Sequence, residues 1–137
     1  MTAGYSGKPL VEKLGIKPGA TIAILNAPSG YDRTLGRLPK QVARKARVAG
    51  PLDFIQLFTS RKRELERRFS ALELALAPAG QLWVSWPKRS SGVPTDLTED
   101  VIRAIGLAHG LVDVKVAAVD DVWSGLKFVR RLKDRPR

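Results

Sequence analysis

The chain has 137 residues, of which 44% are hydrophobic and 27% are charged, and it contains no cysteine. This length and composition predict one globular domain over residues 1–137. The lack of cysteine excludes disulfide frameworks, thiol catalysis and thiolate metal sites, and it favours a cytoplasmic location. No apolar run is long enough to span a membrane, and the first residues do not match a secretory signal, so we expect no membrane association.

A formal net charge of +11 is the one extreme property of the composition. Such a charge suggests a polyanionic partner, either nucleic acid or another polyanion. The basic side chains concentrate in residues 33–47, in residues 61–68 and in the tail from Lys127 onward. The candidate nucleic-acid-binding residues are Arg33, Arg37, Arg44, Lys45, Arg47, Arg61 and Arg63. The alternative is a solvated surface that keeps a small protein soluble.

In chain order, the first predicted element is a short helix that starts at Pro9 and stops at Gly15. Residues 22–25 form a short continuous apolar run, which is typical of a parallel strand buried on both faces. Prolines and glycines then interrupt any long element as far as Pro51. That stretch leaves room for a helix near residues 29–35 and a short strand near residues 43–48.

Residues 52–58 restore the strand pattern, and Ser60 is placed to cap the helix that follows. Four apolar side chains of that helix recur on one face: Leu65, Phe69, Leu72 and Leu76. Pro78 and Gly80 should end the helix and lead into a central strand over residues 81–86. In this strand Trp83 and Trp86 should face opposite sides of the sheet.

After a polar loop, Asp96 and Glu99 match a capping box at the start of another helix, which Gly110 closes. Alternating valines over residues 112–116 predict a half-buried strand. The final strand, over residues 126–129, is rich in Lys and Arg, and this suits a sheet edge. The short connection between these two strands requires them to be antiparallel.

Together these elements predict an α/β fold, a three-layer sandwich with a mostly parallel, Rossmann-like sheet of about six strands and a C-terminal antiparallel hairpin. In such sheets ligands bind beyond the carboxyl ends of the strands, near the switch in strand order. The side chains expected there include Pro28, Thr59 and Ser60. Six residues are the predicted ligand-binding set: Asn26, Ser29, Gly30, Trp86, Lys88 and Arg89.

These residues suggest an anion site, because Ser29 and Gly30 could open a helix whose free amides favour phosphate, with Lys88 or Arg89 supplying charge. The alternatives are an ordinary turn into a helix and a Trp86 that only covers the edge of the core. We expect no metal or catalytic residues. Asp96, Glu99 and Asp100 are better explained by helix capping, and the single histidine, His109, by its place at a helix end.

Four segments of the sequence are similar to the bacterial family known as domain of unknown function 3052. They are residues 4–7 (GYSG), 77–88 (APAGQLWVSWPK), 95–100 (TDLTED) and 122–127 (VWSGLK). The resemblance spans nearly the whole chain and implies the same α/β fold. It implies no activity, because that family has no established catalytic residues.

The chain also resembles, more distantly, class I methyltransferases that use S-adenosylmethionine. Their sheets end in an antiparallel hairpin, and a helix and a Pro-Gly turn like residues 77–80 often join their fourth and fifth strands. Those enzymes carry several glycines after the first strand, whereas Asn26-Ala27-Pro28-Ser29-Gly30 has one. The chain also lacks one strand and one helix of that pattern.

The main hypothesis is therefore a non-catalytic Rossmann-like module that binds an anionic or nucleotide-like ligand beside Asn26, Ser29, Trp86 and Lys88. One alternative is an accessory protein that binds RNA or DNA through the arginine-rich segments. The other is a degenerate relative of the S-adenosylmethionine-dependent methyltransferases. S-adenosylmethionine or a nucleotide is the cofactor to consider, without an intact motif for either.

Overall fold

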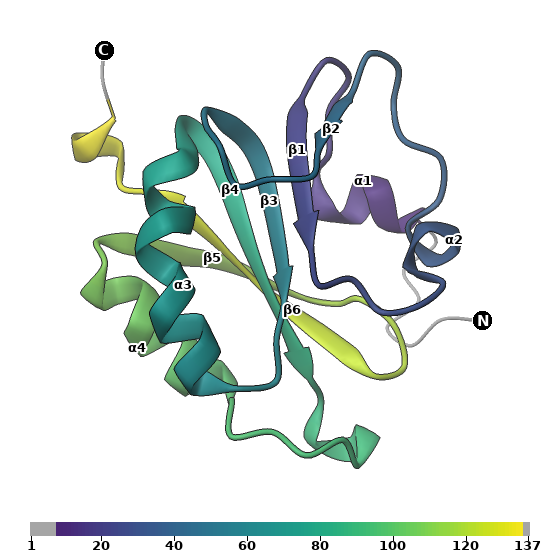
Figure 1. The fold of residues 1–137 in the computed structure, drawn as a ribbon, viewed down its shortest axis with the longest axis vertical. Helices are drawn as coiled ribbons and strands as arrows, with labels where there is room; N and C mark the ends of the chain where they lie inside the picture. The colour runs from purple at the N-terminus through teal and green to yellow at the C-terminus, as the bar shows by residue number, and fades with distance from the viewer. Residues whose placement is uncertain (1–7, 136–137) are drawn as a thin grey trace.

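The computed structural model of the protein describes residues 8–135 (Figure 1). The segment 4–7 and the last two residues of the basic tail, 136–137, lie outside the described residues. The elements are α1 (Leu10–Leu14), β1 (Thr21–Leu25), α2 (Tyr31–Leu35), β2 (Ala43–Lys45), β3 (Leu52–Phe58), α3 (Lys62–Ala75), β4 (Leu76–Pro87), the 3₁₀ turn η1 (Arg89–Ser91), α4 (Glu99–Ala108), β5 (Leu111–Ala118), β6 (Trp123–Arg130) and the 3₁₀ turn η2 (Leu132–Asp134). No helix among these elements is long and apolar enough to cross a lipid bilayer.

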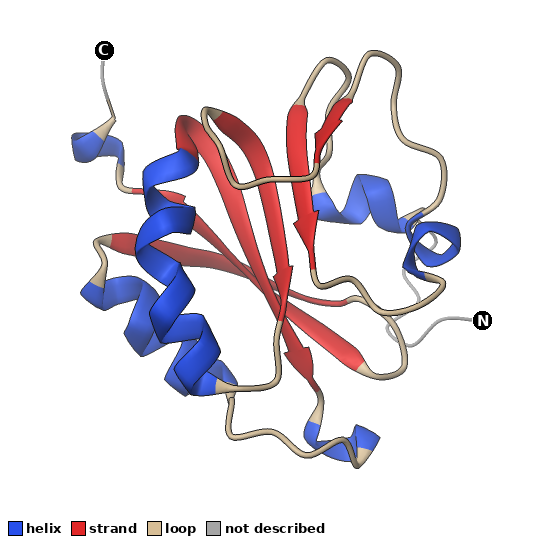
Figure 2. Ribbon diagram, in the orientation of Figure 1, coloured by secondary structure: helices blue, strands red, loops and turns tan. Residues whose placement is uncertain are grey.

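The six strands form one sheet in the order β2-β1-β3-β4-β6-β5. The first four are parallel, and β6 is antiparallel to both β4 and β5. Helices α3 and α4 cover one face of the sheet, and α1 and α2 lie on the other (Figure 2). The predicted three-layer α/β fold with a mostly parallel sheet and a terminal hairpin is confirmed.

The position of the last strand differs from the prediction. β6 is an interior strand between β4 and β5, and β5 forms the sheet edge. Leu126 and Phe128 of β6 are fully buried, while its basic residues Lys127 and Arg130 are only half-buried. A count of charged residues suggested an edge, but the hairpin folds back so that its second strand completes the sheet beside β4.

β4 also starts earlier than predicted, at Leu76, directly after α3. Leu52 pairs with Leu76 and Phe54 with Gln81, so the intervening residues of β4 form a large irregularity in the ladder. Pro78 is accommodated there because a bulged residue needs no ladder hydrogen bond. Gly80 is held close to β3, where an added Cβ would lie 2.8 Å from the Leu52 carbonyl oxygen.

Both predicted helix caps are wrong. Thr98, and not Asp96, caps α4 by accepting a hydrogen bond from the Val101 amide at 3.2 Å. Asp96 instead accepts from the amide of Lys62 at 2.7 Å, so it satisfies a donor at the start of α3. The N-cap residue of α3 is Arg61, and Ser60 uses its carbonyl to accept from Thr95. A loop distant in sequence thus satisfies this helix end, which local sequence does not reveal.

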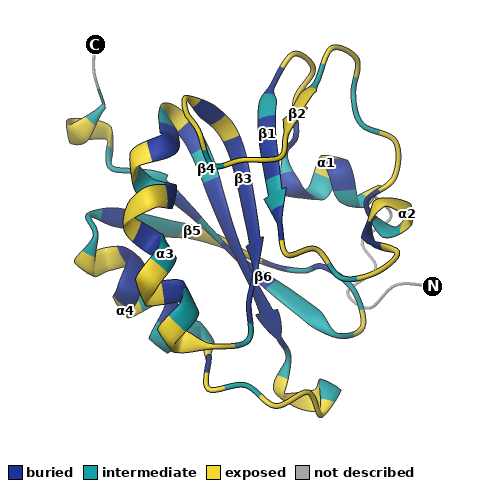
Figure 3. Ribbon diagram, viewed as in Figure 1, coloured by how far each residue is buried: buried dark blue, intermediate teal, exposed yellow. Residues whose placement is uncertain are grey.

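The central strands β3 and β4 are largely buried (Figure 3), and the two faces of the sheet bury different sets of side chains. The α3/α4 face buries an entirely apolar cluster that includes Phe69, Trp86 and Phe128. The α1/α2 face buries Trp83, whose Nε1 donates to the Leu14 carbonyl at 3.0 Å. The prediction that Trp83 and Trp86 face opposite sides is confirmed.

The connection between β2 and β3 contains no helix. It spans only residues 46–51, and it passes along the face that α3 covers, where an added Cβ at Gly50 would lie 2.5 Å from the Ala75 carbonyl oxygen. This agrees with the expectation of a fold that is one strand and one helix short of the methyltransferase pattern.

Candidate functional site

The switch in strand order lies between β1 and β3. From β1 the chain continues to β2 on one side, and from β3 it continues to β4 on the other. A crevice forms at such a point because the two connections leave the sheet in opposite directions, and ligands of open parallel sheets bind there. Asn26 and Thr59 are the first residues beyond the two strand ends.

One carboxylate links the two strand ends. Thr59 donates its hydroxyl to Oε1 of Glu64 at 2.5 Å, and Asn26 donates from Nδ2 to Oε2 at 3.5 Å. Asn26 has a positive φ of 58°, a left-handed conformation that asparagine tolerates better than most residues. Glu64 lies in the first turn of α3 and is half-buried, so it connects β1, β3 and α3 at the switch point.

This carboxylate keeps capacity for a ligand. A glutamate offers about four acceptor positions, and the two described bonds occupy one on each oxygen. Beside it is a hollow of about 370 Å³, which is lined by Ser60, Arg61, Arg63, Glu64 and Arg67. Three guanidinium groups and one carboxylate give the lining of this hollow a net positive charge. The site therefore combines a carboxylate that can accept hydrogen bonds from ligand hydroxyl groups with a surface that attracts an anion.

A buried polar chain positions the loop after β1. The Tyr31 hydroxyl donates to Oε1 of Gln56 at 2.7 Å, and Nε2 of Gln56 donates to the Ser85 hydroxyl at 3.1 Å. The Tyr31 and Phe58 rings pack in a T-shaped arrangement, with 4.7 Å between their centroids. Burial raises the pKa of the Tyr31 hydroxyl, which keeps it protonated as the donor. These contacts fix the start of α2 and hence residues 26–30.

The six predicted ligand-binding residues are distributed over several places. Asn26 lies at the switch point, and Ser29 and Gly30 are exposed in the following loop. Gly30 has a φ of 80°, and no atom lies within 4 Å of where a Cβ would be. The helix that follows, α2, has only five residues, so it provides little dipole for a phosphate.

Trp86 is 7% exposed and belongs to the apolar cluster under α3 and α4. Together with Arg89 it lines a second hollow, of about 450 Å³, against the loop before α4. The backbone amide of Lys88 donates to the Val122 carbonyl at 2.7 Å, which ties it to the β5–β6 turn. Trp86 and Arg89 therefore line the same hollow, whereas Asn26 lies elsewhere, in contact with Glu64.

The predicted nucleic-acid-binding residues are all exposed. Arg44 forms an ion pair with Asp32 at 2.9 Å. Lys45 is the last residue of β2, and Arg47 lies in the connection that follows. Arg33 is on α2 and Arg37 follows it. Arg61 and Arg63 line the hollow beside Glu64. Sequence reasoning missed Glu64 itself, and the available signal was a pair of carboxylates, Glu64 and Glu66, among the arginines that follow Thr59.

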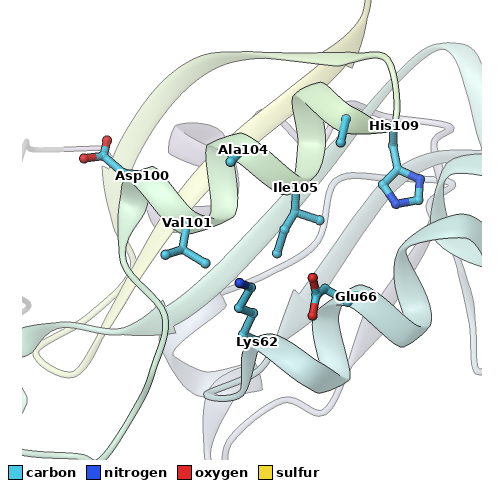
Figure 4. Close-up of a pocket in the computed structure, with 8 residues that line it drawn as sticks. Lys62, Glu66, Asp100, Val101, Ala104, Ile105 and His109 are labelled. Carbon is cyan, nitrogen blue, oxygen red and sulfur yellow. The ribbon is translucent and has the colours of Figure 1, made fainter.

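A third hollow, of about 530 Å³, lies between α3 and α4 (Figure 4). Its floor is apolar, and its rim carries charged and polar groups from both helices. The lining residues are Lys62, Glu66, Asp100, Val101, Ala104, Ile105, Ala108 and His109. His109 lies 3.2 Å from Glu73 through Nδ1 and stacks over Phe69 at a centroid distance of 4.6 Å, so its described contacts are structural. Residues 8–135 contain no group of three or more side chains that could hold a metal ion.

Comparison with solved structures shows that the fold is that of S-adenosylmethionine-dependent methyltransferases. A Sulfolobus solfataricus protein assigned as a type 11 methyltransferase matches with a TM-score of 0.66 and 12% identity, over 93% of each chain. Magnesium protoporphyrin IX methyltransferase of Synechocystis PCC 6803 with bound S-adenosylmethionine matches with a TM-score of 0.61 and 13% identity, over 89% of this chain and 74% of that one. A methyltransferase of Aquifex aeolicus matches with a TM-score of 0.59 and 15% identity, over 86% of both chains.

Comparisons of sequence give no further assignment. No protein-family profile matches the chain, so the resemblance to domain of unknown function 3052 finds no support there. No curated protein matches it either. The likeness to methyltransferases is therefore one of fold.

Proposed function

We propose that this chain is a derived relative of the class I methyltransferases that binds a nucleotide-like ligand in the crevice between β1 and β3. The observation that carries the proposal is Glu64, which joins Asn26 and Thr59 at the switch point and faces a hollow lined by arginines. Ligands of this sheet architecture bind at that place.

Each part of the site has a role in this proposal. The free acceptor positions of Glu64 take the hydroxyl groups of a ribose, because a carboxylate is the side chain best suited to accept two neighbouring hydroxyls. Arg61 and Arg63 bind the phosphate or carboxylate of the ligand. Asn26 and Thr59 hold the Glu64 carboxylate in place.

S-adenosylmethionine itself is the second candidate ligand, and the fold of the solved neighbours favours it. The residues fit it less well. The loop at residues 26–30 offers a single glycine for close approach of backbone to a cofactor. Arginines around the hollow also repel a sulfonium cation, so the site is better matched to an anionic nucleotide.

Calorimetric titration with AMP, ADP, adenosine, S-adenosylhomocysteine and S-adenosylmethionine tests the proposal. We expect AMP and ADP to bind more tightly than the uncharged nucleoside and than S-adenosylmethionine. Glu64→Gln should weaken AMP binding by about tenfold, the equivalent of one charge-assisted hydrogen bond. Glu66→Gln, an exposed change on the same helix, is the matched control and should leave the affinity unchanged.

Two outcomes would contradict the proposal: no binding of any of these ligands at millimolar concentration, or equal losses in the two glutamate variants. Tight binding of S-adenosylmethionine, with methyl transfer to an acceptor that is lost in Asn26→Ala, would instead favour the second candidate.

A further inference from the structure

Lysines from four separate parts of the chain converge near the α1 side of the β5–β6 hairpin. Lys115 of β5 lies opposite Lys127 of β6 in the strand register. Across the gap to α1, Nζ of Lys115 donates to the backbone carbonyl of Lys13 at 3.0 Å. We call the whole set the lysine face: Lys13, Lys17, Lys88, Lys115 and Lys127.

The electrostatics show that these ammonium groups interact with one another. Burial lowers the pKa of Lys127, and the charges of Lys115 and Lys17 lower it further. Burial likewise lowers the pKa of Lys13, and here Lys115 and Lys88 add to the effect. Burial is the larger cause in both cases, and the smaller effect of the neighbouring lysines reflects positive charges that folding brings close together.

Such an arrangement works against folding. Like charges directly opposite each other on neighbouring strands destabilise a sheet. Residues that lower stability in this way are typical of functional surfaces, where activity is maintained at the expense of stability. A bound polyanion would reverse the sign of this interaction, because each phosphate would then lie between ammonium groups.

Residues 8–135 leave the surface around these lysines partly uncovered. The residues of β5 and β6 that share this side, Val112 and Val129 as well as Lys115 and Lys127, are half-buried or exposed. α1, with five residues, is too short to cover them. Lys115 and Lys127 are therefore placed on a part of the sheet that is not fully buried.

One aromatic ring continues this face. Trp123 lies on the same side of β6 as Lys127, with Gly125 between them. Its indole and the Phe58 ring pack at nearly right angles, with 5.1 Å between the ring centroids. Trp123 is half-buried, so part of the residue remains accessible. A half-exposed ring beside a row of cations is the combination that binds single-stranded nucleic acid, in which bases stack and phosphates pair.

We propose that the lysine face binds the phosphate backbone of a single-stranded nucleic acid, with a base stacked on Trp123. This site is distinct from the arginine-rich segments of residues 33–47 and 61–68 and from the crevice at Glu64. An acidic peptide would satisfy the charges but would make no use of the ring, so the observations favour nucleic acid.

The test measures fluorescence anisotropy of a labelled single strand of about 12 nucleotides over a range of salt concentrations, with the full chain. We expect the double variant Lys115→Gln/Lys127→Gln to lose at least about tenfold in affinity. A plot of the logarithm of its binding constant against the logarithm of the salt concentration should have a slope that is smaller by about 1.4. Each phosphate contact on a single strand contributes about 0.7 to this slope, and the variant loses two such contacts. The matched control Lys62→Gln/Lys133→Gln removes the same charge from two exposed positions outside the lysine face and should change affinity less than threefold.

Fold integrity is checked by the melting temperature, which should be equal or higher in the lysine variant. Adding Asn26→Ala should not change binding of the strand, which separates this site from the nucleotide crevice. Equal losses in the lysine-face variant and the control variant would overturn the proposal, since binding would then follow net charge alone. Absence of binding at low salt, or equally strong binding of polyglutamate, would overturn it as well.

Discussion

The two faces of the sheet are stabilised in different ways. Under α3 and α4, the buried cluster is entirely apolar and includes Leu72, Ile102 and Phe128. Under α1 and α2, burial depends on side-chain hydrogen bonds such as those of Gln56, and part of the strand surface remains uncovered. Two helices of 14 and 10 residues cover the first face, whereas two of five residues lie on the second.

This difference suggests a division of roles. A face closed by apolar packing supplies most of the stability, because the free energy of burial grows with the apolar area removed from water. The other face can then hold crowded charges and an open surface without unfolding. The proposed lysine face lies on that second side, and the predictions below compare the two.

The largest effect should come from truncation at the center of the apolar face. Phe128→Ala should lower the free energy of unfolding by about 3–5 kcal/mol, since it removes a fully buried ring packed against Phe69. Val129→Ala is the matched control on the opposite face of the same strand, where the side chain is half-buried. Urea denaturation measures both, and similar losses for the two variants would break the comparison.

An added methyl group at Gly106 should also destabilise the apolar face. Alanine favours a helix by about 1 kcal/mol over glycine. However, a Cβ at this position would lie 2.1 Å from Cε1 of Phe128, so we expect a net loss of about 1–3 kcal/mol. The double variant Gly106→Ala/Phe128→Leu should recover part of the loss relative to the sum of the single changes. A more stable Gly106→Ala protein, measured by the same urea titration, would contradict this packing.

On the other face, the hydrogen bond of Tyr31 should matter more than its ring packing. Tyr31→Phe keeps the aromatic ring but leaves Oε1 of Gln56 buried without its donor, at an expected cost of about 1–3 kcal/mol. Ser29→Ala, in the exposed loop nearby, is the control and should be nearly neutral.

The same tyrosine predicts a dependence on alkaline pH. Its pKa is raised in the folded state, so the unfolded chain releases the proton first as pH rises. The stability that it contributes should therefore be complete below pH 10, about the ordinary tyrosine pKa, and should decline above it. Melting curves of Tyr31→Phe should lack this decline, and an equal decline in both proteins would assign it to other groups.

The smallest effect, and the one of opposite sign, should come from the lysine face. Lys127→Gln removes one of two like charges that lie opposite each other and leaves the bond from Lys115 to the Lys13 carbonyl in place, so stability at low salt should stay the same or rise by about 0.2–1 kcal/mol. High salt should abolish the gain, because screening weakens the repulsion. A clear loss of stability in this variant would mean that the lysine is a structural residue.

The sequence predicted the fold well where the signal is local. The apolar runs at residues 22–25 and 52–58 form β1 and β3, and the single glycine after β1 anticipated the departure from the methyltransferase pattern. Caps and strand order could not be predicted in this way. Asp96 is used by a helix 34 residues earlier, and β6 enters the sheet interior because of where the hairpin docks.

The candidate sites show the same limit. Runs of arginine are visible in a sequence, but Glu64 becomes informative only when the ends of β1 and β3 meet beside it. Lys13 and Lys115 are 102 residues apart and only the folded sheet brings them into contact. Isolated lysines carry no local pattern, and so their convergence was not predictable.

The interior position of β6 has a consequence for how the protein is made. While the ribosome is still synthesising residues 123–130, β5 has no neighbouring strand, and β4 is open along its side. The β4-β6-β5 part of the sheet can therefore close only after the last strand has left the exit tunnel, so its assembly depends on contacts between distant parts of the chain. Until then, the side of β4 that β6 later covers is an unpaired strand edge.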